Sequence, residues 1–222
     1  AFEADERCLL IPAHAWTPWF AIFGSQSGFD TLEECFGDMS RYIYALETGL
    51  SSNPEMNWRL SRLDRLFLVS NSDAHSLENL GREASVFEMR VPSYDELHRI
   101  LSKHDQASFI ETIEFFPEEG KYYADGHRAC DVWMEPEETK RRQGLCPKCG
   151  KPLTVGVLHR VSDLADRPSH PPKPAKAVPF RSIVPLGEII AAGYDVGVAS
   201  KRVTKELERL RESATEFHIL LD

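Results

Sequence analysis

Residues 66–75 read Leu-Phe-Leu-Val-Ser-Asn-Ser-Asp-Ala-His, an apolar run that leads directly into polar and metal-ligating side chains. Such a run predicts a short strand buried on both faces, as in a parallel sheet. The polar residues then occupy the loop beyond the end of the strand. In α/β proteins these loops form the active face. The stretch therefore predicts a buried strand that carries a site at its end.

A second segment has the same arrangement. Cys8-Leu9-Leu10-Ile11-Pro12 predicts another buried strand, and His14 follows it. Asp73 and His75 are two residues apart, so in an extended segment both side chains point the same way and can reach one ion or adjacent ions. His14, Asp73 and His75 are thus candidate metal ligands. The alternative is that His14 and Asp73 only cap loops. Nearby aromatic side chains could line a pocket beside His14, although packing in the core is favoured for them: Trp16, Trp19 and Phe20.

Strand and helix patterns alternate through the first 120 residues. The predicted helices cover 30–47, with Asp30 and Glu33 as a capping box, then 54–64, and then 93–103, which Ser93 and Glu96 begin. Further strands are predicted over 86–91 and 112–116. This alternation predicts an α/β fold with a parallel sheet.

Two short-spaced pairs of metal-ligand residues follow. His127 and Cys130 form the first pair, and Cys146 and Cys149 form the second. Two such pairs joined by a loop deliver the four donors of a tetrahedral Zn²⁺ site, and a closed site of this kind is structural. Basic residues near the pairs could contact phosphate or simply be solvated: Lys140, Arg141, Arg142, Lys148 and Lys151.

The tail begins with a proline-rich stretch over 167–179, which predicts a stiff connector. Helices are predicted over 186–192 and over 201–213, where Ser200 is the cap. The turn between them resembles a helix-hairpin-helix element. Gly197, with Ser200, Lys201 and Arg202 at the next helix start, could then bind a DNA phosphate. An ordinary helical hairpin would have a similar sequence.

The 222 residues carry a net charge of −9, which is unevenly spread. Residues 1–120 carry 9 basic and 21 acidic side chains, and residues 121–222 carry 17 basic and 14 acidic ones. Charge alone favours ordinary surface variation over a polyanion-binding half. No apolar run is long enough to span a membrane. Cys8 and Cys35 are expected to be buried thiols, and this use of cysteine fits a reducing cytoplasm.

Several longer stretches resemble endonuclease Q and its bacterial relatives, within the polymerase-and-histidinol-phosphatase (PHP) superfamily. The resemblance spans nearly the whole chain and is carried by residues 12–38, 47–64, 68–76, 80–84, 113–130 and 146–167. It implies a partial PHP-type (β/α) barrel over 1–120, a zinc-ribbon-like module over 121–166, a linker over 167–180 and a helical, DNA-binding tail over 181–222.

The resemblance also implies an activity. Endonuclease Q-like proteins nick DNA on the 5′ side of deaminated bases such as uracil and hypoxanthine, and at abasic sites. His14, Asp73 and His75 would then be catalytic ligands for Zn²⁺, Mn²⁺ or Mg²⁺, and His127, Cys130, Cys146 and Cys149 would hold structural Zn²⁺. The substrate partner would be damaged DNA.

One part of the PHP pattern has no counterpart in the sequence. An early His-x-His strand and further ligands should precede the His14 motif, and the chain instead starts at Ala1. We therefore expect the N-terminal metal motifs to be missing, which would leave the metal centre incomplete. The alternatives are a non-catalytic, zinc-containing nucleic-acid-binding module and a PHP phosphoesterase acting on a small phosphate ester. The second alternative would need neither the zinc module nor the basic tail.

Overall fold

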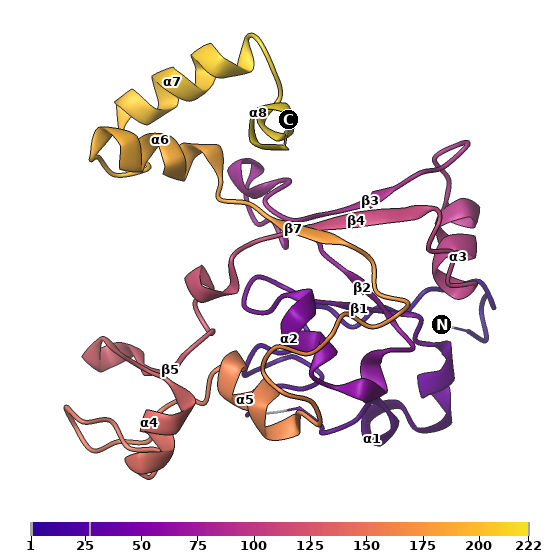
Figure 1. Ribbon diagram of the computed structural model, residues 1–222, viewed down its shortest axis with the longest axis horizontal. Helices are drawn as coiled ribbons and strands as arrows, with labels where there is room; N and C mark the ends of the chain where they lie inside the picture. Colours follow the sequence, from indigo (N-terminus) through magenta and orange to yellow (C-terminus); the bar gives the residue numbers. More distant parts are fainter. Residues whose placement is uncertain (1, 27, 222) are drawn as a thin grey trace. The chain divides into compact units, whose positions relative to one another are not determined.

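The computed structural model describes residues 2–26 and 28–221 (Figure 1). Its helices are α1 (Leu32–Phe36), α2 (Pro54–Trp58), α3 (Tyr94–Ser102), α4 (Pro136–Arg141), α5 (Val157–Leu164), α6 (Leu186–Tyr194), α7 (Lys201–Arg211) and α8 (Glu216–Leu221). Its strands are β1 (Ala45–Glu47), β2 (Phe67–Val69), β3 (Ala84–Phe87), β4 (Phe109–Glu114), β5 (Asp125–His127), β6 (Val132–Met134) and β7 (Phe180–Ser182). Short 3-10 turns are η1 (Gly37–Tyr42), η2 (Ser61–Leu63), η3 (Leu77–Asn79), η4 (Pro117–Glu119) and η5 (Arg128–Cys130).

The chain divides into two compact units, Ala1–Arg181 and Ser182–Asp222. The first unit contains β1 to β6 with α1 to α5, and the second contains α6, α7 and α8. The segments 121–166 and 167–180 both lie inside the first unit. The four-part division expected from the sequence stays a prediction.

The centre of the first unit is the parallel pair β1 and β2, in which Glu47 is in register with Val69. Apolar side chains cover both faces of this pair. Ala45 and Phe67 pack with Phe109 on one face, where the two phenylalanine rings meet edge to face at 5.1 Å. Leu46 packs on the other face with Trp16 and other buried residues. This double burial explains why strand β2 has an uninterrupted apolar sequence.

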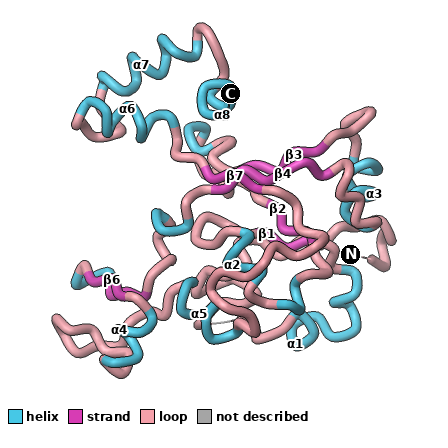
Figure 2. The backbone as a smooth tube through the Cα atoms, in the orientation of Figure 1, coloured by secondary structure: helices cyan, strands magenta, loops and turns pink. Residues whose placement is uncertain are grey.

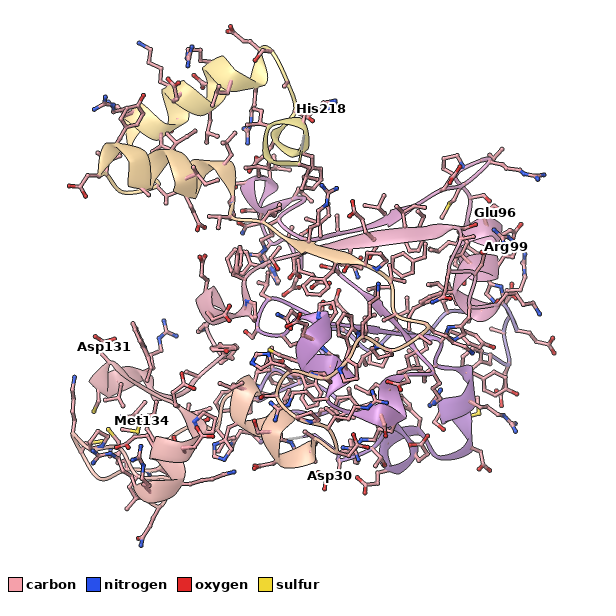
Figure 3. All side chains as sticks on the ribbon, in the orientation of Figure 1. Asp30, Glu96, Arg99, Asp131, Met134 and His218 are labelled. Carbon is pink, nitrogen blue, oxygen red and sulfur yellow. The ribbon has the colours of Figure 1, made fainter. Side chains whose placement is uncertain are left out.

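A second sheet has the strand order β3-β4-β7, and Figure 1 shows these strands side by side with α3 at one end. β3 and β4 are antiparallel, with a register shift between Val86 and Phe87. The expectation of a wholly parallel sheet was therefore wrong for this pair, because the order of helices and strands along a chain does not fix strand direction. An ion pair between Glu96 and Arg99, both labelled in Figure 3, stabilises the exposed face of α3.

The described strands form three small sheets and no closed barrel, and much of the backbone between them is loop (Figure 2). The mixed α/β class is confirmed. The third sheet is the antiparallel hairpin of β5 and β6. It is followed by α4 and then by α5, whose Val157 and Val161 are fully buried in the same cluster as Leu46.

Several predicted caps are confirmed. Ser93 begins α3, and its hydroxyl accepts a hydrogen bond from the Glu96 N–H at 3.3 Å. Ser200 begins α7 in the same way and accepts from the Val203 N–H at 3.4 Å. Serine at these positions satisfies an N–H group that the first helical turn leaves without a partner.

The predicted helix over 30–47 was wrong. Gly37, at a φ of 53°, ends α1 after five residues, and the chain continues through η1 into β1. The N-cap is Thr31 rather than Asp30, and its hydroxyl accepts from the Glu34 N–H while the Glu34 carboxylate accepts from the Asp30 N–H. The cap therefore lies one residue later than expected, and the returning bond from Glu34 goes to the residue before the cap. The apolar spacing at 32–43 came from one short helix and one tight turn, which together mimic helical periodicity.

Residues 8–12 were also expected to form a strand, and the structure assigns them none. Pro12 has no N–H to donate to a ladder. The segment beside β1 is held by the bond from the Glu47 N–H to the Pro12 carbonyl and by the bond from the Ala15 N–H to the Glu47 carbonyl, both at 3.1 Å. The predicted helix over 54–64 is also shorter, because α2 ends at Trp58 and only the turn η2 follows. Cys8 and Cys35 are half-buried rather than buried.

The second unit is a helical hairpin with a short third helix. Val203 of α7 is fully buried, and Gly187 of α6 packs near Val198, Val203 and Leu207. Glu216 at the start of α8 accepts from the Leu186 N–H at 2.8 Å and so caps the first turn of α6. Among the described helices, none has the length and apolar character needed to cross a membrane.

Candidate functional site

The two cysteine- and histidine-containing pairs come together in the structure. His127 ends β5 and Cys130 lies in η5, while Cys146 and Cys149 lie on a tight turn that closes with a 2.8 Å bond from the Gly150 N–H to the Cys146 carbonyl. The ligand atoms of the four residues all lie within 4.8 Å of one another. The edges of a tetrahedron around an ion at thiolate distance are about 3.8 Å, so this donor set fits a tetrahedral metal ion. We call these four residues the Cys/His cluster.

The electrostatics of the Cys/His cluster point the same way. The hydrogen bond of Cys130 with Cys149, followed by desolvation and a hydrogen bond with Cys146, raises the pKa of Cys130 to about 11, and the charges of the two neighbouring sulfurs add to this rise. A cation at the centre would relieve that repulsion and hold the thiols as thiolates. The Lys148 ammonium donates to the Cys130 carbonyl at 2.8 Å and fixes one turn against the other.

A buried contact anchors the hairpin beneath the cluster. Asp125, which is fully buried, accepts from the Gly156 N–H and from His159 Nδ1, both at 2.6 Å. Asp125 opens β5 and His159 lies on α5, so this contact fixes the hairpin to the core of the first unit. Sequence reasoning missed both residues.

An open cleft of about 670 Å³ lies elsewhere in the first unit, and all three predicted catalytic ligands line it. We call it the His14 cleft. Its lining is His14, Thr17, Trp19, Phe20, Gly49, Leu50, Ser51, Asp73, His75, Lys121 and Tyr122.

Two of the predicted ligands have strained backbones. His14 has a φ of 30° and Asp73 has a φ of 45°, in the left-handed region that residues other than glycine seldom occupy. Gly49 packs directly against His14, because a Cβ on Gly49 would lie 2.9 Å from both Cα and Cβ of His14. Such strain persists only where the surrounding contacts impose it, and it concentrates at functional sites.

The two imidazoles present the same nitrogen. His75 Nδ1 lies 2.9 Å from the Asp73 carbonyl, which can only accept, so Nδ1 carries the proton and Nε2 keeps its lone pair. His14 Nδ1 lies 3.1 Å from the Thr17 hydroxyl, which also lies 3.0 Å from the Trp19 carbonyl as a donor. That hydroxyl is thus able to accept from His14 Nδ1. Both rings can therefore offer Nε2 to an ion.

The three predicted ligands share the cleft without forming a closed set. His75 Nδ1 lies 4.0 Å from Asp73 Oδ1, and the His75 side chain is 83% exposed. Among the described residues, the Cys/His cluster is the one group of three or more His, Cys, Asp and Glu side chains that offers close ligand atoms. The assignment of His14, Asp73 and His75 as catalytic ligands stays a prediction.

Three buried glutamates behind the cleft escaped sequence reasoning. Glu47, Glu83 and Glu114 are 7%, 2% and 0% exposed. Burial and the nearby charge of Glu114 raise the pKa of Glu83 to about 9, and burial raises the pKa of Glu114 to about 7. The wrongly predicted helix over 30–47 hid Glu47, which is in fact the last residue of a strand.

The aromatic residues after His14 have different environments. Trp16 is 1% exposed, packs in the core and donates to the Asn57 side chain at 2.8 Å, as the preferred interpretation expected. Trp19 and Phe20 are instead 42% and 92% exposed and line the cleft. Core packing was therefore the wrong expectation for these two.

The predicted DNA-binding residues lie at the turn of the second unit. A Cβ on Gly197 would meet no atom within 4 Å, Ser200 caps α7, and the Arg202 guanidinium lies 3.7 Å from the centre of the Tyr194 ring. This stacking holds Arg202 across the hairpin. The basic residues at the end of α4 and at its C-cap are ion-paired instead, Lys140 with Asp163 and both Arg141 and Arg142 with Glu138.

Comparison with known proteins identifies relatives of this chain, although no protein-family model matches it. The crystal structure of the lesion-specific endonuclease PfuEndoQ from Pyrococcus furiosus matches with a TM-score of 0.82 and 31% identity, over 96% of this chain and 52% of that one. Endonuclease Q in complex with a 27-mer duplex substrate, with an abasic lesion at the active site, matches with a TM-score of 0.81 and 31% identity, over 95% and 52% of the two chains.

Two curated relatives are uncharacterized proteins. MJ0043 of Methanocaldococcus jannaschii is 28% identical over 217 residues, which are 94% of this chain and 26% of that protein. YqxK of Bacillus subtilis is 34% identical over 164 residues, which are 73% of this chain and 40% of that protein. The chain thus spans about half the length of the solved relatives and less of the curated ones.

Proposed function

Because the chain belongs to the endonuclease Q-like family, we propose that it functions as a metal-dependent DNA endonuclease. The proposed reaction is a nick at abasic sites, or on the 5′ side of deaminated bases such as uracil and hypoxanthine. The observation that carries the proposal is the His14 cleft, because His14, Asp73 and His75 line it together with exposed aromatic side chains.

The cleft residues would have distinct tasks. Imidazole Nε2 atoms and a carboxylate suit Zn²⁺, Mn²⁺ or Mg²⁺. Such ions, when bound, lower the pKa of a bound water and neutralise charge on the attacked phosphate. Thr17 and the Asp73 carbonyl would fix the orientation of the two rings. Lys121, which also lines the cleft, supplies a positive charge for the DNA backbone.

Trp19 and Phe20 would stack on a base that has left the duplex. Aromatic faces stack on bases of any sequence, and deaminated bases pair weakly enough to make extrusion less costly. Their exposure within the cleft supports this role.

The cleft would hold only part of a larger ligand set. Three ligands of an open cleft are fewer than a PHP-type centre of several ions uses, and a partial PHP-type barrel would supply only some of them. The Cys/His cluster would hold structural Zn²⁺ in a ribbon-like module, because its four donors form a closed set. Five cysteines without disulfides fit a reducing cytoplasm.

The second unit would bind the DNA backbone. The open backbone at Gly197 and the first turn of α7 offer N–H groups to a phosphate, and Lys201 and Arg202 add charge. A non-catalytic nucleic-acid-binding module is the second candidate function. It is favoured by one observation, that the cleft ligands do not form a close group.

A nicking assay tests the proposal. The full-length protein is incubated with Mn²⁺ and 5′-labelled duplexes that contain an abasic site, uracil, hypoxanthine or no lesion. Asp73→Asn is expected to lower the nicking rate by at least about 100-fold, as removal of a partner of developing charge does elsewhere. Asp95→Asn is the matched control, because Asp95 lies on α3 in an exposed pair with Arg7.

Two outcomes would decide between the candidates. Lesion-specific nicking that Asp73→Asn removes and Asp95→Asn leaves intact supports the nuclease. Salt-sensitive DNA binding without nicking, unchanged by Asp73→Asn, would support the non-catalytic module instead.

A further inference from the structure

Glu47 has an unusual set of contacts for a buried acid. It is the last residue of β1 and is 7% exposed. Its Oε2 accepts from the His14 N–H at 2.6 Å, and its Oε1 accepts from the Asn71 side-chain amide at 2.8 Å. Both carboxylate oxygens are therefore engaged by residues of the two loops that carry the candidate ligands.

The backbone of Glu47 holds the first loop as well. Its N–H donates to the Pro12 carbonyl and its carbonyl accepts from the Ala15 N–H, both at 3.1 Å. Together with the side-chain bond, three hydrogen bonds tie residues 12–15 to this one glutamate. His14 lies at the centre of that segment in its left-handed conformation.

The parallel pairing explains how one residue reaches both loops. Glu47 is in register with Val69, the last residue of β2, so the two strands end at the same edge. Asn71 lies two residues beyond Val69, and Asp73 two residues further. The side chain of Glu47 therefore lies between the segment of His14 and the segment of Asp73.

We propose that Glu47 is a positioning residue that sets the spacing between His14 and Asp73 across the cleft. It would not touch the ions or the DNA. This inference rests on the proposed nuclease function, because it concerns the ligands of that site.

A carboxylate is needed for this task. The two groups that face Glu47 are both donors, an amide N–H and a side-chain NH₂. A carboxylate accepts from both, whereas a glutamine amide offers one acceptor and one donor. Glu47→Gln would therefore set an NH₂ group against another donor at a partly buried contact, so either the Asn71 amide must turn over or one of the two loops must move away.

The same logic supplies a rescue. In Glu47→Gln/Asn71→Asp, the new amide at position 47 can donate to the new carboxylate at position 71 and accept from the His14 N–H. The two hydrogen bonds return with the donor and acceptor exchanged. A residue that only filled space would show no such rescue.

The experiment measures nicking of an abasic duplex with Mn²⁺ by the full-length protein. Glu47→Gln is expected to lower kcat by about 10- to 100-fold, the range for residues that orient metal ligands, with KM for DNA nearly unchanged. The double variant is expected to recover to within about threefold of the unchanged protein. Glu111→Gln is the matched control, because Glu111 also accepts two bonds, from Arg181, and does not line the cleft.

An unchanged kcat in Glu47→Gln, or a double variant no better than the single one, would overturn the inference. If Glu47→Gln does not fold, Asn71→Ala at an exposed position removes one of the two bonds and must itself lower kcat. A protein that never nicks refutes the proposed function alone. Glu47 is then judged by Mn²⁺ affinity and by the His14 amide proton shift, and both must change in Glu47→Gln and return in the double variant.

Discussion

The Cys/His cluster and the His14 cleft use similar side chains in opposite ways. The four cluster donors come from residues 127–149, and short turns gather them within 4.8 Å of one another. The proposed cleft ligands come from residues 14 and 73–75, and the pairing of β1 with β2 brings their loops to one edge. One arrangement is local and closed, and the other is long-range and open.

The difference teaches where the stability of each site comes from. A closed set of four donors gains its order from the ion, so the surrounding module needs little core. Its apolar cluster is indeed small, with Val132, Cys146 and Leu153 buried. The cleft is instead supported by two larger apolar clusters and by buried glutamates, so we expect its geometry not to depend on an ion.

The largest expected effect is loss of the ion from the cluster. Cys146→Ala removes the most buried of the four donors, and binding free energies of about 10–16 kcal/mol for such sites depend on all four. We expect the tightly held ion to be absent after gel filtration, as measured by elemental analysis, and the amide signals of residues 125–156 to lose dispersion. Signals from the core around β1 and β2 should remain.

Cys35→Ala is the control for this variant. Cys35 lies on α1 and packs beside the core, away from the cluster. It should keep the ion. If Cys146→Ala keeps the ion, the cluster does not need all four donors. The contrast between a closed cluster and an open cleft would then be wrong.

The second effect concerns the acids behind the cleft. The folded pKa of Glu83 is raised to about 9 from 4.5, so between these values the unfolded chain releases a proton that the folded chain keeps. Folding stability therefore falls as pH rises through this window, by up to about 1.4 kcal/mol per unit. Glu83→Gln lacks this dependence. We therefore compare the free energies of unfolding of Glu83→Gln and the unchanged protein. Between pH 5 and pH 8 the difference should shift in favour of Glu83→Gln by roughly 4 kcal/mol at most.

Urea denaturation at several pH values measures this difference. Glu114, with a pKa of about 7, titrates in both proteins and cancels in the comparison. Glu111→Gln serves as the control, since Glu111 is paired with Arg181. If the free energy of unfolding of Glu83→Gln and of the unchanged protein depends on pH in the same way, Glu83 is already ionised in the folded protein. The raised pKa behind the cleft would then be wrong.

The cluster and the cleft also differ in how far the sequence predicts them. The short spacing within each of the two pairs, His127 with Cys130 and Cys146 with Cys149, predicted the cluster. A local turn is enough to place both members of such a pair. Ser93 and Ser200 were equally readable, since a cap depends on the next three residues. The polar residues after β2 correctly pointed to a loop at a strand end, and the cleft contains His14, Asp73 and His75.

Long-range features were not readable in this way. Glu47 was hidden because a helix cut short by Gly37, followed by η1, imitates one longer helix. The raised pKa values of Glu83 and Glu114 arise from burial by segments far apart in the chain. The antiparallel direction of β4 depends on how α3 returns the chain, which no periodicity encodes.

The smallest expected effect compares one glycine from each site. Gly49 and Gly150 have nearly equal φ values, 69° and 71°, so alanine at either costs about 1–2 kcal/mol of backbone strain. A Cβ on Gly150 would meet nothing within 4 Å, whereas one on Gly49 would lie 2.9 Å from His14 Cα and Cβ. Gly49→Ala should thus lose a further 1–3 kcal/mol or so through overpacking, measured by urea denaturation. If Gly49→Ala and Gly150→Ala lose the same unfolding free energy, the His14 loop moves aside without cost. The cleft would then be no more preorganised than the cluster without its ion.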